Sequence, residues 1–404
     1  MMKLRYIGFV LFLCFLVINC DRNTRITSIE REDLFTLNIG KMEDQIALFN
    51  MEGNRGIRRA SIAMKDGLFY ISDGNGGKIL RYNSYGDLLF MIYNDETNPP
   101  PMTLRPLVEG SFVTRWAVTH PLLDPGNITV DSRRHIYVQD SLPFERHSYD
   151  AESRALLDNI ILHFDADGRF VEFLGREGIG GTPFPKIEGL YTSVNDELAV
   201  VCRHIMGWDV YWYNSEGMLL FMVQLKLNAL PIPPDRDNVF PSLDMISVGI
   251  DERSIYLKID YFSNTFDEST NIRTGIEPDS SVIWIVNVEN GLWERYVDVP
   301  FFEYTIIEQN RRVAYRMLYS LLGMIENRRA VLTFPVDGGY SILIMSTDST
   351  GVQYRGFIQV DNEELEFNAF NLSADGILSG LLVDNWQARL VWWRTDRFMG
   401  ESSS

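Results

Sequence analysis

The chain has 404 residues, with 37 Lys and Arg against 55 Asp and Glu and a formal net charge of −18. Its 46% hydrophobic and 23% charged residues exclude an intrinsically disordered chain. The acidic balance argues against a nucleic-acid partner, because such partners require clustered Lys and Arg. Three cysteines are too few for a disulfide scaffold. The length predicts either two or three ordinary domains or one large repeat architecture.

The first twenty residues have the pattern of an export signal. Lys3 and Arg5 precede an uncharged run of twelve residues, Ile7–Ile18. This run is too short for a membrane-spanning helix, which needs about 20 residues, and its length is typical of a secretory signal. It ends at Asn19 and Cys20, and polar residues follow at once.

This ending resembles the lipobox of bacterial lipoproteins, in which the Cys becomes the first residue and carries the acyl chains. Asn19 departs from the Gly, Ala or Ser of most lipoboxes, although spirochaete lipoboxes admit Asn. The resemblance implies that residues 1–19 are removed, that Cys20 is lipidated and that residues 20–33 form a tether. A plain secretory signal and an uncleaved anchor are the alternatives.

Removal of residues 1–19 takes away Lys3 and Arg5 and changes the net charge to −20. Anionic lipid would repel such a body, so we expect the acyl chains, and no basic patch, to hold it at the membrane. Cys14 leaves with the signal. Cys202 lies in an apolar run and is expected to be buried and unreactive.

An internal repeat begins with two similar segments, residues 62–73 and 128–140. Each predicts an alternating strand, a polar turn and an aromatic or β-branched strand that ends in Asp. A third strand and a hairpin follow each segment, with Gly86 and Gly168 in the turns, where a positive φ is needed. Four further units with weaker patterns follow, which gives six units in all.

Radial repetition of four-stranded units is typical of a β-propeller. The first two units resemble the NHL repeat, and the whole resembles the six-bladed propeller lipoproteins of spirochaetes. We therefore predict an all-β, NHL/TolB-like six-bladed propeller over residues 34–400, with a tail at 401–404. Because the last unit lacks a fourth strand, Leu34–Ile39 is predicted to close it and to remove an exposed sheet edge. Two separate β-domains are the alternative.

Motifs of common enzymes are absent from the sequence. It has no Cys pair with metal spacing, no Gly-x-Ser-x-Gly, no phosphate loop and no His-Glu-x-x-His. His120 and His204 could approach the mouth of a propeller. His163 alternates with Leu162 and Phe164 and is therefore expected on a solvated face.

The best candidate site comes from alignment of the six innermost strands on their last apolar residue. Six positions upstream, this alignment predicts a polar ring at Arg58, Asp124, Glu188, Asp244, Tyr319 and Asn368. The gluconolactonase/paraoxonase type of propeller is similar in placing Glu, Asn and Asp at its centre around Ca²⁺. That resemblance implies Ca²⁺ as a candidate cofactor, since Ca²⁺ prefers oxygen ligands. Polar strand starts at a water-filled mouth are the simpler explanation.

Five long insertions interrupt the repeat, and loops of this length on a rigid frame are common binding sites. They are Asn94–Pro125, Ser141–Asp158, Lys226–Pro241, Phe262–Asp279 and Pro300–Ala314. The residues Glu303–Leu322 are compatible with one short helix.

Our first functional hypothesis is a non-enzymatic, lipid-anchored cell-envelope protein that uses the propeller to bind a protein or a ligand, on the periplasmic side of a bacterial membrane or at the cell surface. It is a fold-level analogy, since propeller lipoproteins occur in outer-membrane assembly complexes. The second hypothesis is a Ca²⁺-dependent hydrolase or lyase, and the third is a surface adhesin.

Overall fold

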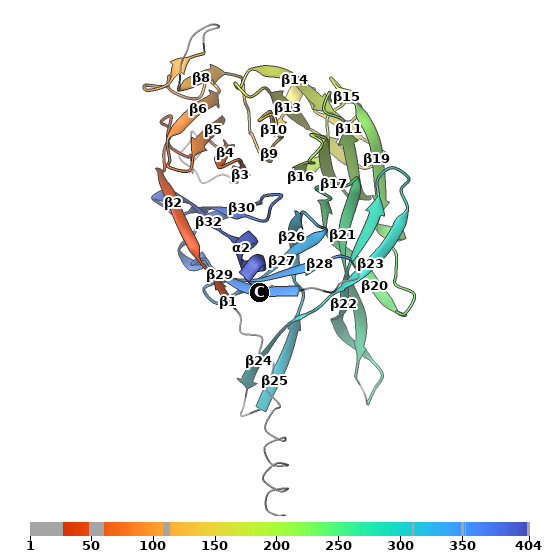
Figure 1. Ribbon diagram of the computed structural model, residues 1–404. Coiled ribbons are helices and arrows are strands. Elements are labelled where there is room, and N and C mark those ends of the chain that lie inside the picture. The colour runs from red at the N-terminus through yellow and green to blue at the C-terminus, as the bar shows by residue number, and fades with distance from the viewer. Residues whose placement is uncertain are drawn as a thin grey trace, which may run out of the picture.

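The computed structural model describes residues 27–47, 60–107, 114–267, 269–308, 311–348, 351 and 353–401. The regular secondary structure of these residues is almost entirely strand, with three short 3₁₀ turns and one helix, α2 (Thr395–Glu401). Among them, six sheets contain four to six strands each and surround a common axis (Figure 1). The predicted all-β class and β-propeller fold are confirmed.

Three sheets come from the first half of the described chain, and each runs outward from an inner strand. The first contains β3 (Ala60–Lys65), β4 (Leu68–Asp73), β5 (Lys78–Asn83), β6 (Leu88–Tyr93), β8 (Trp116–Thr119) and β7 (Arg105–Pro106). The second contains β9 (Ile128–Val130), β10 (Ile136–Ser141), β13 (Asn159–Phe164), β14 (Phe170–Gly175) and β15 (Gly178–Ile179). The third contains β16 (Lys186–Thr192), β17 (Leu198–His204), β18 (Gly207–Tyr213) and β19 (Leu219–Lys226).

The other three sheets follow the same order, and two of them take their outermost strand from the start of the chain. The fourth contains β20 (Val239–Val248), β21 (Ser254–Phe266), β22 (Arg273–Asn287) and β23 (Trp293–Val299). The fifth contains β26 (Ser320–Ile325), β27 (Arg329–Val336), β28 (Gly339–Ser346), β29 (Gln353–Gln359) and β1 (Thr27–Ile29). The sixth contains β30 (Phe367–Leu372), β31 (Leu378–Val383), β32 (Gln387–Trp393) and β2 (Arg31–Asn38).

Two small ribbons lie outside these sheets. The first falls within the predicted insertion Ser141–Asp158, and the second begins in the predicted insertion Pro300–Ala314 and extends three residues beyond it. The ribbon of β11 (Ser148–Asp150) and β12 (Ala155–Leu157) belongs to the connection between β10 and β13. The ribbon of β24 (Phe302–Glu308) and β25 (Arg311–Met317) joins the fourth sheet to the fifth. The short helix expected within Glu303–Leu322 is therefore wrong. β-Branched and aromatic residues alternate with polar ones there, which favours strands.

The core is divided among the interfaces between neighbouring sheets. On β10, Ile136 and Val138 pack toward the first sheet, whereas the intervening Tyr137 packs toward the third. This is the period of two expected for strands with a neighbour on each face. The cluster that contains Leu37 and Ile71 joins the sixth sheet to the first and so completes the ring.

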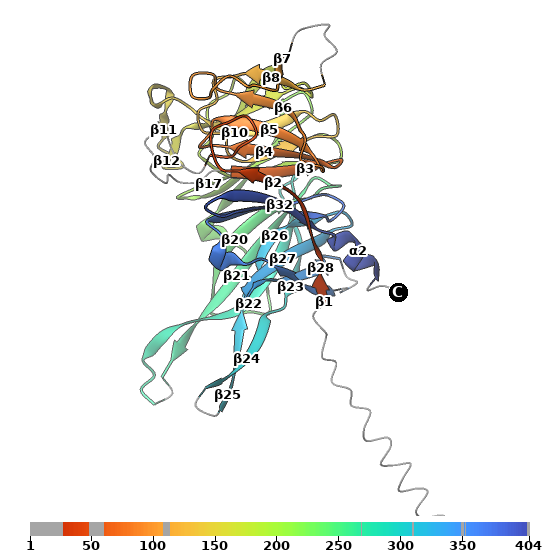
Figure 2. The same ribbon diagram turned by 90° about the vertical axis from the view of Figure 1, so that its left-hand side faces the viewer.

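The start of the described chain forms a clasp over two sheets, and we call Thr27–Asn38 the N-terminal clasp. Its second part, β2, pairs antiparallel with β32, which confirms the predicted closing strand. Its first part, β1, pairs parallel with β29 in the neighbouring sheet (Figure 2). The predicted tether at 20–33 is therefore wrong from Thr27 onward. A three-residue strand with one buried side chain, Ile29, leaves no periodic pattern to recognise.

The Asp that ends the repeated second strand has a structural role in the first two sheets. The buried Asp73 carboxylate accepts hydrogen bonds from the Ala47 and Gly76 amides, at 2.9 and 3.0 Å. The Asp140 carboxylate accepts from the Leu123 and Asp124 amides, at 3.1 and 2.7 Å. In both sheets the Asp holds a segment that precedes the innermost strand.

Candidate functional site

A cleft with a volume of about 870 Å³ opens on one face of the ring, next to the first three sheets. The starts of β3 and β16, the residues just before β9 and the connection that contains β11 and β12 line it. His204 at the end of β17 and Ile205 in the turn to β18 complete the wall. The predicted insertion Ser141–Asp158 therefore contributes to a concave site.

A row of hydrogen-bonded amide side chains lies along the cleft. Asn127 Nδ2 donates to Gln139 Oε1 at 2.9 Å, and Gln139 Nε2 donates to Asn159 Oδ1 at 2.7 Å. Asn159 Nδ2 donates to Asp158 Oδ1 at 2.6 Å. Gln139 and Asn159 are buried. Because each amide is fixed by its neighbour, the polar surface of the cleft is preorganised.

Cationic side chains gather at this cleft although the chain as a whole is acidic. Lys186 and Arg203 lie 2.8 and 3.7 Å from the Glu188 carboxylate. Arg154 extends from the ribbon of β11 and β12, and it is exposed. Because Glu188 lies against two of these cations, and Asp124 and Asp158 also line the cleft, Arg154 is the cation that favours a ligand with a negative or strongly polar group.

Two histidines also line the cleft, and one of them was expected there. His147 Nε2 donates to the Leu142 carbonyl at 2.8 Å, and His204 Nε2 lies 3.4 Å from Asp209 Oδ2. The structure thus places His204 at the mouth, as the sequence suggested. His120 instead packs against the rings of Phe164 and Phe170. Burial lowers the pKa of His120.

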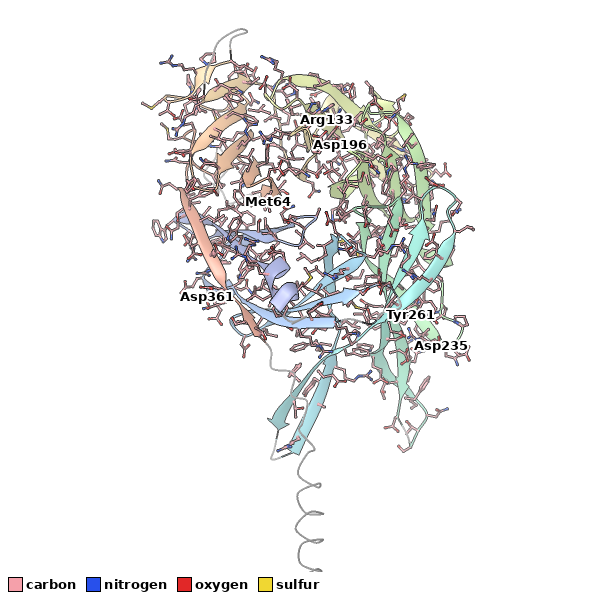
Figure 3. All side chains as sticks on the ribbon, viewed as in Figure 1. Met64, Arg133, Asp196, Asp235, Tyr261 and Asp361 are labelled. Carbon is pink, nitrogen blue, oxygen red and sulfur yellow. The ribbon has the colours of Figure 1, made fainter. Side chains whose placement is uncertain are left out.

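The central channel has a smaller volume than the cleft, about 280 Å³, and the two share Ser61 and Asn127 in their walls. Hydrogen bonds between sheets constrict it. Thr129 Oγ1 and Thr192 Oγ1 are 3.1 Å apart, and the Met64 amide donates to Asn371 Oδ1 at 3.0 Å. Figure 3 labels Met64 near the centre of the ring.

The described members of the predicted polar ring do not come together. Arg58 lies outside the described residues. Asp124 lines the cleft, and Glu188 lines the central channel. The Asp244 carboxylate lies 3.1 Å from the ammonium of the buried Lys258.

The remaining two members point elsewhere. Tyr319 is buried and packs against the rings of Phe302 and Phe334. Asn368 donates to Asn362 Oδ1 at 3.3 Å. The alignment failed for a physical reason, because β-bulges at Glu188 and Asp244 each insert one residue into an inner strand. One extra residue reverses the face on which the upstream side chains lie.

Within the residues that the structure describes, no group of three or more His, Cys, Asp or Glu could hold a metal ion. Ca²⁺ takes six to eight oxygen ligands, so the described ring members do not fit it. Cys202 is buried, and burial raises its pKa well above the usual range, as expected for an unreactive thiol. Cys20 and Cys14 lie outside the described residues.

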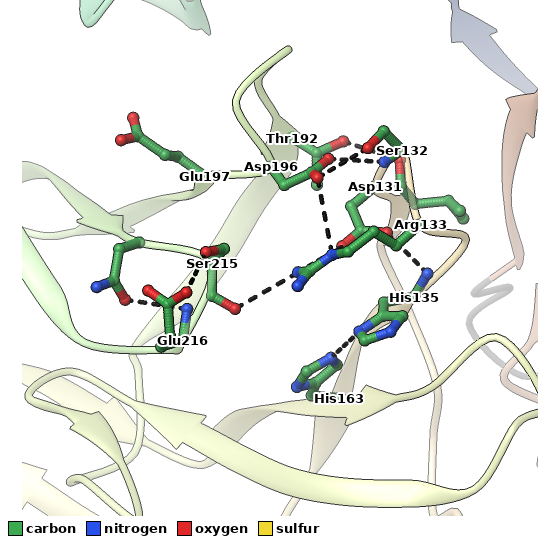
Figure 4. Close-up of polar contacts among 12 residues, drawn as sticks. Asp131, Ser132, Arg133, His135, His163, Thr192, Asp196, Glu197, Ser215 and Glu216 are labelled. Atoms are coloured by element: carbon green, nitrogen blue, oxygen red, sulfur yellow. Dashed lines mark hydrogen bonds and ion pairs between the residues drawn. The ribbon is translucent and has the colours of Figure 1, made fainter.

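Figure 4 shows a polar network at the opposite ends of the inner strands, where β9 and β16 finish. The Ser132 amide and hydroxyl donate to the two oxygens of Asp196, at 2.7 and 2.8 Å. Arg133 lies 2.9 Å from Asp131 and 3.7 Å from Asp196. This network ties the second sheet to the third.

The same network contains a chain of two imidazoles and a carboxylate. His135 Nδ1 and His163 Nε2 are 2.9 Å apart, and His163 Nδ1 lies 3.3 Å from Glu172 Oε1. His163 is buried, so its expected position on a solvated face is wrong. Burial lowers its pKa, and stacking on Tyr137 covers the ring.

No protein-family model and no curated protein matches this chain. Similar solved structures include the polysaccharide lyase Uly1, with 11% identity, a TM-score of 0.42, and coverage of 91% of this chain and 99% of that one. A glucose dehydrogenase has 9% identity, a TM-score of 0.39, and coverage of 90% and 98%. The Dos1 propeller has 10% identity, a TM-score of 0.32, and coverage of 91% and 95%. Similarities this low carry no argument about activity.

In the described part of the chain, no helix is both long enough and apolar enough to cross a membrane.

Proposed function

We propose that this chain is a non-enzymatic, lipid-anchored protein of a bacterial cell envelope, whose propeller binds a polar ligand or a polar segment of a partner protein. The cleft next to the first three sheets carries this proposal. Its volume of about 870 Å³ lies within the range of roughly 300–1,000 Å³ typical of ligand pockets.

Two properties of the cleft support binding. The amide row at Asn127, Gln139 and Asn159 is held by its own hydrogen bonds, so the bound state requires little ordering of these side chains. Arg154, at the rim, is an exposed cation in a chain with a net charge of −18. An anionic group on the ligand would find a cation there.

The finer family assignment is also a proposal. We infer that the six sheets correspond to the six expected blades and that the chain is an NHL-like propeller lipoprotein of the spirochaete type. The Asp at the end of the second strand of the first two sheets and the Gly hairpins at Gly86 and Gly168 support it.

The anchor and the location follow from the same proposal. Acylation of Cys20 would place the propeller on the periplasmic side of a membrane or at the cell surface. Membrane contact would occur through the lipid, with an envelope protein as a further partner and no nucleic acid. A Ca²⁺-dependent hydrolase or lyase gains no specific support, because the described ring members do not converge.

Native mass spectrometry of the protein purified from membranes under non-denaturing conditions tests the cleft. We expect a non-covalent adduct on the wild type that is lost in Arg154→Ala and Arg203→Ala. Arg105→Ala is the matched control, because Arg105 is also exposed and lies on the outer strand β7. Wild-type protein without an adduct, or equal adducts in all four proteins, would contradict the proposal.

A further inference from the structure

The ribbon of β24 and β25 is an isolated two-stranded element, although such elements are at best marginally stable in water. Its seven residue pairs run from Phe302 and Met317 at the base to Glu308 and Arg311 near the turn. Neither strand pairs with any of the six large sheets. An element of this kind needs a surface against which its apolar face can pack.

One face of the ribbon is apolar. Phe302 pairs with Met317, and Tyr304 pairs with Tyr315, so these four side chains share a face. The two tyrosine rings stack with their centroids 5.4 Å apart. Only Phe302 packs against a core cluster, whereas Tyr304 and Met317 are each 38% exposed.

A second hairpin projects next to this ribbon. β21 and β22 are the longest strands described, with 13 and 15 residues. β23 pairs only with Ser281–Val286, so Arg273–Ser280 of β22 extend beyond it. Three large apolar side chains near the tip are exposed: Phe266 (53%), Ile272 (65%) and Ile276 (56%).

Both elements project from the same side of the ring. In Figure 1 their tips lie at similar levels below the ring, and the start of β1 lies on that side too. Figure 2, turned by 90°, shows the same arrangement. The ribbon leads directly into β26, the inner strand of the sheet that also contains β1.

The length of chain before β1 agrees with this arrangement. Seven residue steps separate Cys20 from Thr27, and they span at most about 25 Å when fully extended. A seven-residue strand such as β24 is about 23 Å long. A bilayer that holds the Cys20 lipid therefore lies within about one ribbon length of this edge of the ring.

We propose that the ribbon β24–β25 and the tip of the hairpin β21–β22 contact the surface of the lipid bilayer and hold the propeller edge-on above it. This inference depends on the proposed acylation of Cys20. Tyrosines and large aliphatic side chains are favoured at the boundary between headgroups and acyl chains.

Charge opposes deep insertion. On the ribbon face opposite Phe302 and Tyr304, Arg312 and Arg316 are exposed and Arg316 lies 3.9 Å from Glu303, so charged side chains flank the apolar face. Hydrogen bonds from Ser269 and Thr270 lower the pKa of Asp267 to about 2. The hairpin tip therefore keeps a negative charge at neutral pH, which confines it to the wet side of the interface.

The test uses the mature protein, acylated at Cys20, in vesicles of zwitterionic lipid with a minor fraction of anionic lipid. An environment-sensitive fluorophore is attached at Met317→Cys on the ribbon or at Ile272→Cys on the hairpin. The matched control is Tyr85→Cys, because Tyr85 is 88% exposed in the turn between β5 and β6. We expect blue-shifted emission, and quenching by lipid-attached quenchers, at residues 317 and 272 but not at residue 85.

Flotation of the same samples separates the two proposals. Protein that floats with the vesicles but shows no shift at residues 317 and 272 would overturn the bilayer contact and leave the anchor intact. Protein that neither floats nor shows a shift would overturn both. Equal shifts at all three positions would show non-specific adsorption and would also refute the edge-on arrangement.

Discussion

The clasp strand β1 packs over a glycine, and this contact allows a quantitative test of the N-terminal clasp. Ile29 is 6% exposed and lies against Gly356 on β29. A Cβ atom placed on Gly356 would be 2.9 Å from Ile29 Cδ1 and 3.1 Å from Ile29 Cγ1. A side chain at Gly356 therefore requires Ile29, and the Phe398 ring at 3.3 Å, to shift.

Two single substitutions should therefore destabilise the protein for opposite reasons. Ile29→Ala removes a buried aliphatic side chain and should lower the free energy of unfolding by about 2–4 kcal/mol. Gly356→Ala overfills the same contact and should cost about 1–3 kcal/mol. In the double variant the Ala methyl group at position 356 occupies space that the Ile29 side chain has vacated, so the destabilisation caused by Gly356→Ala should largely disappear.

Urea unfolding followed by tryptophan fluorescence and circular dichroism measures all four proteins. We expect an interaction energy of about 1–3 kcal/mol that favours the double variant over the sum of the single variants. The control is Ser28→Ala, an exposed position on the same strand, with an expected change below about 0.5 kcal/mol. Additivity within about 0.5 kcal/mol would refute the placement of β1 over Gly356.

Three further predictions concern the anchor, a buried acid and the link between sheets. Cys20→Ala should abolish acyl labelling and release the protein from membranes, and unchanged labelling would refute lipidation. Burial raises the pKa of Asp140 from 3.8 to about 6, so its contribution to stability is present below pH 4 and is lost as the pH rises to 6. The melting temperature of Asp140→Asn, compared with that of the wild type, should therefore increase between pH 4 and 7, by the equivalent of up to about 3 kcal/mol. A difference between the two proteins that does not change with pH would argue against the raised pKa. Asp196→Ala removes the acceptors used by Ser132 and should lower the free energy of unfolding in urea by about 1–3 kcal/mol. Asp196→Asn should lower it less, because Asn keeps one acceptor oxygen and tolerates the positive φ of 58° at this position.

The sequence predicted the architecture well where the pattern repeats. The strands around Ile62–Asp73 and Ile128–Asp140 alternate clearly, because their side chains pack between two neighbouring sheets. The closing strand β2 could be predicted for a related reason, since an alternating segment without a partner matched a unit that lacked one strand.

The candidate site could not be predicted in the same way. The cleft is made by side chains from three sheets and an insertion, such as Asn127, Arg154 and His204, and no spacing in the chain relates them. The predicted ring assumed that all inner strands keep one register, and the bulges at Glu188 and Asp244 break it. A bulge depends on packing against neighbours, so a single strand carries little signal for it.

His163 shows a second limit of alternation. The pattern around Leu162 and Phe164 predicts that His163 lies on the other face, and this is correct. That face is covered by Tyr137 and His135, so it is not solvated. This sheet packs against a neighbouring sheet on each face, so the alternation of its side chains separates two buried interfaces and does not separate core from solvent.

The N-terminal clasp has a consequence for how the protein reaches its folded state. Residues Thr27–Asn38 are made first, yet their partners on β29 and β32 lie more than 300 residues later in the chain. Loop closure over such a separation is slow, and contacts of this kind raise the contact order of the fold. Until β32 is synthesised, the ring cannot close, and the open edges of its sheets remain exposed to other chains. A nascent chain of this design would therefore benefit from holdase chaperones, and its last residues would set the time at which its first ones become ordered.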